Sequence, residues 1–145
     1  MRPIVAAGET FSWDRHTTEP VARDYWLRPP PARAVVAVSD AGVVLGTAEM
    51  GPNHGGPAAH VANAGFMVDP AHAGEGVGRR LGEWVIEQAR ADGYRAMQFN
   101  AVAASNTRAV ALWQSVGMEI LCTVPDGFRH PTLGLTGLLI MYQPF

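Results

Sequence analysis

A glycine-rich segment between a predicted strand and a predicted helix constrains the fold of this chain more than any other feature. The strand covers residues 60–68 and the helix covers residues 78–91. At such a junction the first backbone N–H groups of the helix lack partners and the helix dipole is positive, so a phosphate can bind there. A plain tight turn is the competing interpretation of the same glycines. The segment consists of Ala73-Gly74-Glu75-Gly76-Val77-Gly78-Arg79-Arg80.

The segment matches neither of the two common nucleotide-binding loops. A dinucleotide fingerprint needs a third glycine, but Arg79 or Leu81 stands there, depending on which glycine starts the count. The acidic residue near the expected offset, Asp92, lies at a helix end rather than at a strand end. All 11 basic residues are arginines, so a phosphate loop with Gly-Lys-Ser/Thr and Schiff-base chemistry are excluded.

Hydrophobic periodicity predicts one α/β domain over residues 1–145, with strands and helices alternating in its second half. Asp40-Ala41-Gly42 is typical of a hairpin turn between the first two strands. Gly93 and Gly117 are expected to end the last two helices. The predicted strands are 34–38, 43–50, 60–68, 94–102, 119–124 and 136–142, the predicted helices are 19–27, 78–91 and 105–115, and a loop is expected over 125–135.

Composition limits the partners and the location. The formal net charge of −2 gives no electrostatic reason to expect nucleic acid. The lone Cys122 has no second thiol for a disulfide, which fits a reducing cytoplasm. No apolar run approaches the roughly 18 residues of a membrane span. The apolar stretch at the start of the chain is too short for a secretory signal. The 5 histidines lack metal-ligand spacing. We therefore expect a cytoplasmic protein without membrane, nucleic-acid or metal partners.

Three motifs in one order resemble the GNAT superfamily of N-acetyltransferases. The family's loop pattern, [QR]-x-x-G-x-[GA], falls on residues 73–78, with Ala73 departing from its first position. The resemblance extends from about residue 34 to the C-terminus, and Thr10-Phe11-Ser12-Trp13 is similar to the amino-acid and phosphinothricin-type branch. The other matching residues are Met67-Val68-Asp69-Pro70 and Asn106 with Ala109, Leu112, Trp113 and Gly117-Met118.

The resemblance implies a GNAT-like fold: a mixed, mostly antiparallel sheet flanked by helices. Family members usually begin with an extra strand that this chain lacks at its start, so the first edge strand is expected to be missing. An unpaired edge favours pairing with another chain, and a homodimer is the assembly that this would give.

The resemblance also implies acetyl-CoA as co-substrate. Backbone N–H groups of the loop would hold the pyrophosphate, and the strand at 66–68 would carry the pantetheine arm. Asn106 would meet that arm, with a helix N-cap as its alternative role. Trp113 takes the place of a tyrosine that protonates the departing thiolate, which indole cannot do; core packing is its alternative. The expected cofactor contacts are Met67, Val68, Ala73, Gly74, Gly76, Val77, Gly78, Arg79, Asn106 and Trp113.

The catalytic groups are less defined by the sequence. By the resemblance, the amide of Met67 or Val68 would face the thioester oxygen. His60 and Glu49 are the candidate general bases for the amine. Asn63 lies where some members carry a glutamate, so relayed water is a third route. Arg129 is a candidate partner for a substrate carboxylate.

The expected function is acetyl transfer from acetyl-CoA to a primary amine of a small molecule or amino acid. Attack of the neutral amine on the thioester gives an amide and free CoA. The alternative is a non-catalytic acyl-CoA-binding or regulatory module, because Ala73 and Trp113 depart from the family pattern. Steady-state release of CoA separates the two.

Overall fold

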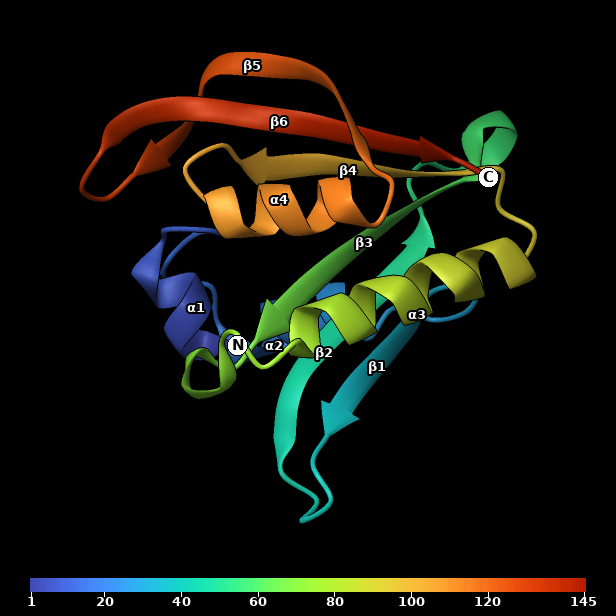
Figure 1. Ribbon diagram of the computed structural model, residues 1–145, viewed down its shortest axis with the longest axis horizontal. Coiled ribbons are helices and arrows are strands. Elements are labelled where there is room, and N and C mark those ends of the chain that lie inside the picture. The colour runs from blue at the N-terminus through green and yellow to red at the C-terminus, as the bar shows by residue number, and fades with distance from the viewer.

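Six strands form one sheet in the order β1-β2-β3-β4-β6-β5 (Figure 1). The computed structural model describes residues 1–145. All neighbouring strands are antiparallel except β3 and β4, which confirms the expected mixed, mostly antiparallel sheet. The strands are β1 (Arg33–Val38), β2 (Val44–Pro52), β3 (Val61–Val68), β4 (Ala96–Ala103), β5 (Glu119–His130) and β6 (Gly134–Pro144), and the helices are α1 (Arg2–Ala7), α2 (Glu19–Trp26), α3 (Val77–Ala91) and α4 (Thr107–Ser115).

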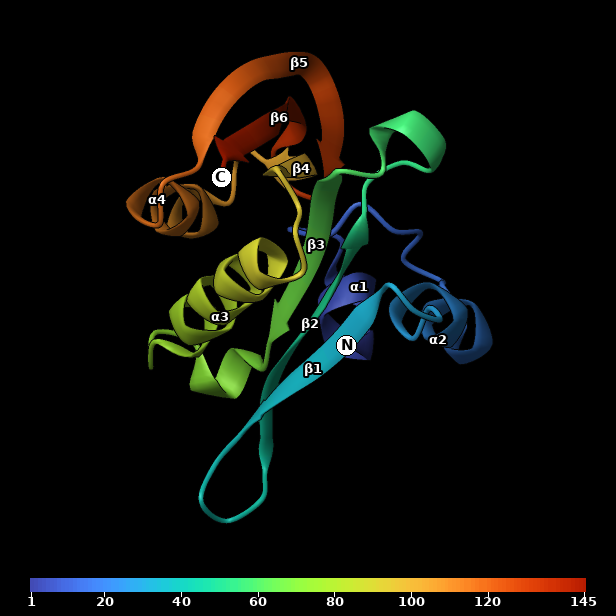
Figure 2. The same cartoon turned by 90° about the vertical axis from the view of Figure 1, so that its right-hand side faces the viewer.

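Helices cover both faces of the sheet. In Figure 2, α3 and α4 lie on one side of β1–β3, and α1 and α2 lie on the other. The inward side chains of α3, among them Leu81, Val85 and Ala89, recur at helical spacing and join the main core. A smaller cluster of Val5, Trp26 and Met67 holds α1 and α2 against the opposite face of the sheet. No helix is long and apolar enough to cross a membrane.

Two expectations about secondary structure are wrong. The helix α1 was not expected, because its six residues are too few to show a period. The loop expected over 125–135 is mostly strand: β5 runs on to His130 and β6 begins at Gly134. The turn residues there form a bulge instead, since the β5–β6 register shifts between Val124 and Phe128 and Asp126 has φ 53°.

The parallel strands β3 and β4 separate soon after they begin. They pair only at Val61–Ala96 and Ala62–Met97, and Figure 1 shows them diverging toward α1 and α4. On its other side β4 changes register against β6 between Phe99 and Val102, and a bulge of this kind bends the bulged strand. The sheet is therefore open between β3 and β4, beside the glycine-rich segment.

Candidate functional site

A groove of about 790 Å³ lies at the opening between β3 and β4. Its walls come from the end of β3, the glycine-rich segment, α4 and α1. All the residues expected to contact acetyl-CoA line this one groove: Met67, Val68, Ala73, Gly74, Gly76, Val77, Gly78, Arg79, Asn106 and Trp113. The sequence analysis missed Arg108, an exposed α4 residue that also lines it.

The glycine-rich segment presents its backbone to the groove. Gly74 and Gly76 have φ of +91° and +79°, a left-handed conformation that L side chains rarely adopt. No side chain caps α3, and the N–H groups of residues 76–79 make no hydrogen bond within the chain. These donors converge at the positive end of the helix dipole. The segment is therefore suited to bind a diphosphate. The sequence pattern alone could not distinguish such a binding loop from a plain tight turn.

The side chain of Arg79 forms hydrogen bonds with other side chains. Its guanidinium donates to Ser115 Oγ at 2.8 Å and to Glu83 Oε1 at 3.3 Å. The bond to Ser115 ties the start of α3 to the end of α4, whereas the bond to Glu83 lies within α3. Arg79 therefore offers the groove its backbone N–H group while its side chain joins the two helices.

The alternation of β3 decides which of its amides face the opening. The Val61 carbonyl accepts a hydrogen bond from the N–H of Asn53, the residue after β2, and the Asp69 N–H donates to the Leu45 carbonyl. Because the direction of these groups alternates along a strand, the odd-numbered residues of β3 turn their backbone N–H and carbonyl groups toward β2. The amide of Met67 consequently faces β2, opposite Thr47. The structure does not place it in the opening. The amides of Phe66 and Val68 point there instead, beyond the last residue paired with β4.

Asn106 and Trp113 stand where the groove turns inward. Asn106 caps α4, because its Oδ1 accepts from the Ala109 N–H at 3.3 Å, while the residue also lines the groove. Trp113 is buried, and its ring lies 4.6 Å from Phe66 and 5.0 Å from Phe99 between centroids. Both roles considered for each residue, local structure and groove wall, therefore coexist.

A second cavity, of about 300 Å³, continues from the groove into the opening between β3 and β4. We call it the inner cavity. It shares its entrance with the groove, since the same five residues line both. Those residues are Thr10, Phe66, Asn106, Ala109 and Trp113. A long molecule in the groove can therefore present its end to a small molecule in the inner cavity.

Glu49 is the one charged residue that lines the inner cavity. It is 2% exposed, and its Oε2 accepts from Arg28 Nη2 at 2.6 Å. Burial raises the pKa of Glu49 above its ordinary value of 4.5, and the hydrogen bond and charge of Arg28 act against that rise. Burial and the nearby Glu49 charge also raise the pKa of Tyr25, which lines the same cavity. The site thus contains a buried carboxylate held by one cation.

The other candidate catalytic residues lie elsewhere or are engaged. His60 is exposed beside the start of β3, where its Nδ1 lies 3.1 Å from the Pro57 carbonyl, and it lines neither the groove nor the inner cavity. Asn63 does line the inner cavity, but its Oδ1 accepts from the Ala64 N–H at 2.9 Å. Arg129 is exposed on β5 and lines neither cavity. No group of three or more His, Cys, Asp or Glu side chains is placed to hold a metal ion.

The Glu49 carboxylate occupies space next to Gly65 that a larger residue would partly fill. The two residues are opposite each other on β3 and β2, and a Cβ on Gly65 would lie 3.1 Å from Glu49 Oε1 and 3.3 Å from the Trp26 ring. Trp26 cannot easily give way, because it is buried and its Nε1 donates to Thr47 Oγ1 at 3.0 Å. The carboxylate position therefore depends on the absence of a side chain at residue 65.

We predict that Gly65→Ala lowers turnover by about 10- to 100-fold through displacement of the carboxylate, since sub-ångström misplacement of a reacting group is costly. The measurement is kcat with Tm recorded in parallel. Gly55→Ala is the matched control, because a Cβ there meets nothing within 4 Å. Wild-type turnover in Gly65→Ala would show that the Glu49 carboxylate need not be held in place.

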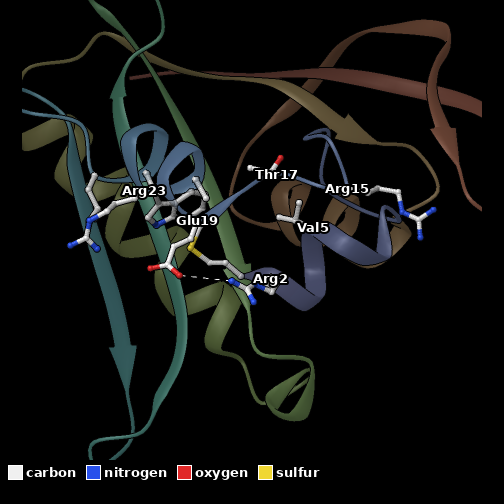
Figure 3. A pocket seen from close by; sticks show the side chains of 10 residues that line it. Arg2, Val5, Arg15, Thr17, Glu19 and Arg23 are labelled. Carbon is white, nitrogen blue, oxygen red and sulfur yellow. Dashed lines mark ion pairs between the residues drawn. The ribbon is translucent and has the colours of Figure 1, made fainter.

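A further cavity, between α1 and α2, lacks the features of a reaction site. It has a volume of about 320 Å³ and a floor that includes the buried Val5 and Trp26. Figure 3 shows Arg2 and Glu19 facing each other across it as an ion pair, at 3.8 Å, whereas Arg15 and Arg23 point away on opposite sides. The paired side chains are 83% and 75% exposed, so solvent screens them. We therefore assign no catalytic role to this cavity.

Comparison with known proteins agrees with this geometry. The family model described as the acetyltransferase (GNAT) family matches residues 2–118. A GCN5-related N-acetyltransferase from Kribbella flavida has 50% sequence identity and a TM-score of 0.96, over 99% of this chain and 87% of that one. An acetyltransferase from Salmonella typhimurium, yncA, solved with acetyl-CoA, shares the fold at 23% identity, with a TM-score of 0.84 over 99% of this chain and 83% of that one.

A curated relative is more distant in sequence. N-acetyltransferase aca1 of Schizosaccharomyces pombe is 26% identical over 139 residues, which cover 86% of this chain. The match spans 66% of that relative's length.

Proposed function

Because this chain belongs to the acetyltransferase (GNAT) family, we propose that it transfers the acetyl group of acetyl-CoA to the primary amine of a small molecule, with Glu49 accepting the amine proton. The observation that carries this proposal is the shared entrance of the groove and the inner cavity. A thioester at the end of the groove would there meet an amine beside a buried carboxylate.

Acetyl-CoA, the co-substrate, supplies an acetyl group as a thioester. The N–H groups of residues 76–79 would bind its diphosphate, and Arg108 adds a positive charge on the groove wall. The amides of Phe66 and Val68 would donate to the pantetheine arm and to the thioester oxygen, where negative charge develops during attack. Asn106 stands at the turn into the inner cavity and would orient the acetyl end of the arm.

Glu49 would make the amine reactive. An amine reaches the site mainly as an ammonium ion, and attack requires its neutral form, so a base must take one proton. In the reaction the amine nitrogen bonds to the acetyl carbon and gives up a second proton to solvent, the carbon–sulfur bond breaks, and CoA leaves as thiolate. Trp113 has no acidic proton for that thiolate, but a thiol with a pKa of about 8.5 is a tolerable leaving group without assistance.

The first test is binding. Acetyl-CoA and CoA are expected to raise Tm, since a ligand at 100 times its Kd adds about 2.7 kcal/mol of stability. NAD and ATP, which need loop motifs that this chain lacks, are expected to give no comparable rise. Release of CoA with a panel of primary amines then tests transfer. Stabilisation without release from any amine would contradict the proposed transfer and favour a non-catalytic acyl-CoA-binding module.

The pH dependence tests Glu49 as the base. A general base works only when it is deprotonated, so the acid limb of kcat should fall at a pH above the ordinary glutamate pKa of 4.5. Arg28→Met removes the hydrogen bond and the charge of Arg28, which both lower this pKa, and leaves the Gly65 backbone hydrogen bond; the acid limb should move to higher pH. By linkage, the variant should also lose stability as pH rises through the Glu49 pKa, because the ionised carboxylate is then buried without its cation.

Arg28→Lys is the control for this shift, since it keeps a cation near the carboxylate and should leave the limb closer to that of the wild type. The substrate amine titrates identically in all three proteins, so its own pKa does not enter the comparison. An acid limb that does not move in Arg28→Met would argue that a group other than Glu49 takes the proton.

A further inference from the structure

The lining of the inner cavity is rich in aromatic side chains and poor in charged ones, and this composition limits which amines can bind there. Its lining contains a single charged group, the Glu49 carboxylate, and no arginine or histidine. Arg28, which contacts Glu49, does not line the cavity. Six aromatic side chains do line it: Phe11, Trp13, Tyr25, Phe66, Phe99 and Trp113.

The aromatic side chains form two separate walls. On one side Trp13 packs edge to face against Phe11 at 5.1 Å and against Tyr25 at 4.8 Å between ring centroids. On the other side Phe66 and Phe99 lie 5.7 Å apart and both contact the Trp113 ring. Such packing holds each ring in place before a ligand arrives. The cavity is therefore shaped for an apolar body between two rigid walls.

Apart from Arg28, which stands behind Glu49 and Tyr25, the nearest basic side chains lie beyond the entrance. Arg108 and His130 line a neighbouring polar pocket of about 220 Å³, which shares Thr10 and Asn106 with the entrance. An α-amino acid carries its carboxylate on the same carbon as the amine, so both groups must enter together. Inside, that carboxylate would find no cation in the lining and would lie near Glu49, which has the same charge.

We propose that the acceptor is a compact primary amine with an aromatic or branched apolar body and no carboxylate on the amine-bearing carbon. This inference rests on the proposed function, which it narrows from small amines and amino acids to one class. The apolar body occupies the space between the two aromatic walls, and the amine points to Glu49 and the groove entrance.

Matched pairs of acceptors test this inference. We would measure kcat/KM from CoA release at saturating acetyl-CoA for 2-phenylethylamine against phenylalanine, tyramine against tyrosine, and 3-methylbutylamine against leucine. The amine of each pair should be favoured by at least about tenfold, since an unpaired buried charge costs more than the about 1.4 kcal/mol to which that ratio corresponds. Phenylalaninamide separates charge from size, because it keeps the bulk of the carboxylate and should react more like the amine.

A positive charge added to the cavity wall tests the role of charge directly. Ser12 is exposed on the cavity wall, so Ser12→Arg introduces a cation without disturbing the core. It should reduce the preference for 2-phenylethylamine over phenylalanine severalfold, whereas Ser12→Met, similar in length but uncharged, should not. Equal or better use of phenylalanine by the wild type would overturn the inference and leave acetyl transfer standing. Failure of every acceptor in a protein that acetyl-CoA stabilises would overturn the proposed function, and this inference with it.

Discussion

Glu49→Gln is expected to lower kcat by about 10²–10⁴-fold, the usual contribution of a positioned general base. Glutamine keeps the size of the side chain and an oxygen that can accept from Arg28, but it cannot take a proton at neutral pH. Glu49 lines the inner cavity and not the groove, so the affinity for acetyl-CoA should stay close to that of the wild type. Steady-state CoA release and the acetyl-CoA Tm shift measure the two quantities separately.

Glu87→Gln is the matched control for this variant. Glu87 is exposed on α3 and lines neither cavity, so removal of its charge should change neither turnover nor binding. If Glu49→Gln keeps turnover within a fewfold of the wild type, the amine proton passes to solvent and the Glu49–Arg28 pair is a structural element. Loss of acetyl-CoA binding in Glu49→Gln would instead show that the inner cavity and the groove fold as one unit.

The sequence predicts the part of the site that is made by neighbours in the chain. The strand β3, the glycine-rich segment and the start of α3 follow each other directly between Val61 and Arg80, so periodicity and glycine placement define them together. For the same reason the groove contacts from Met67 to Arg79 could be named in advance. What the sequence could not assign was the direction of each amide, because that depends on the pairing of Val61 and Asp69 with β2.

The acceptor side of the site depends on contacts between distant segments. Glu49 and Arg28 are 21 residues apart, and Trp26 reaches Thr47 across the same interval. No local pattern predicts such pairs, so the sequence left both His60 and Glu49 as candidates for the base. The structure separates them: His60 is exposed before β3 and lines neither cavity, whereas Glu49 lines the inner cavity and is paired with Arg28. The opening between β3 and β4 likewise lies beside a shift in the β4–β6 register that local propensity does not encode.

Gly78→Trp is expected to weaken acetyl-CoA binding by at least about a hundredfold, which corresponds to about 2.7 kcal/mol. Gly78 is the second residue of α3 and lacks a positive φ, so a side chain is compatible with its backbone. A Cβ there would lie 3.4 Å from Leu112 Cδ2 and 3.6 Å from Val68 Cγ2, in ordinary contact. An indole beyond that Cβ must extend into the groove between α4 and β3, where the diphosphate and pantetheine arm would lie.

Two variants separate obstruction of the groove from damage to the fold. Gly78→Ala should fold and bind nearly as the wild type does, since its added methyl group fits and alanine favours helix by about 0.5–1 kcal/mol. Glu87→Trp places the same large ring on an exposed position of the same helix, away from the groove, and should bind normally. Calorimetric titration with acetyl-CoA gives the affinities, and far-ultraviolet circular dichroism reports on α3. Unchanged affinity in a well-folded Gly78→Trp would mean that the diphosphate does not lie over the start of α3.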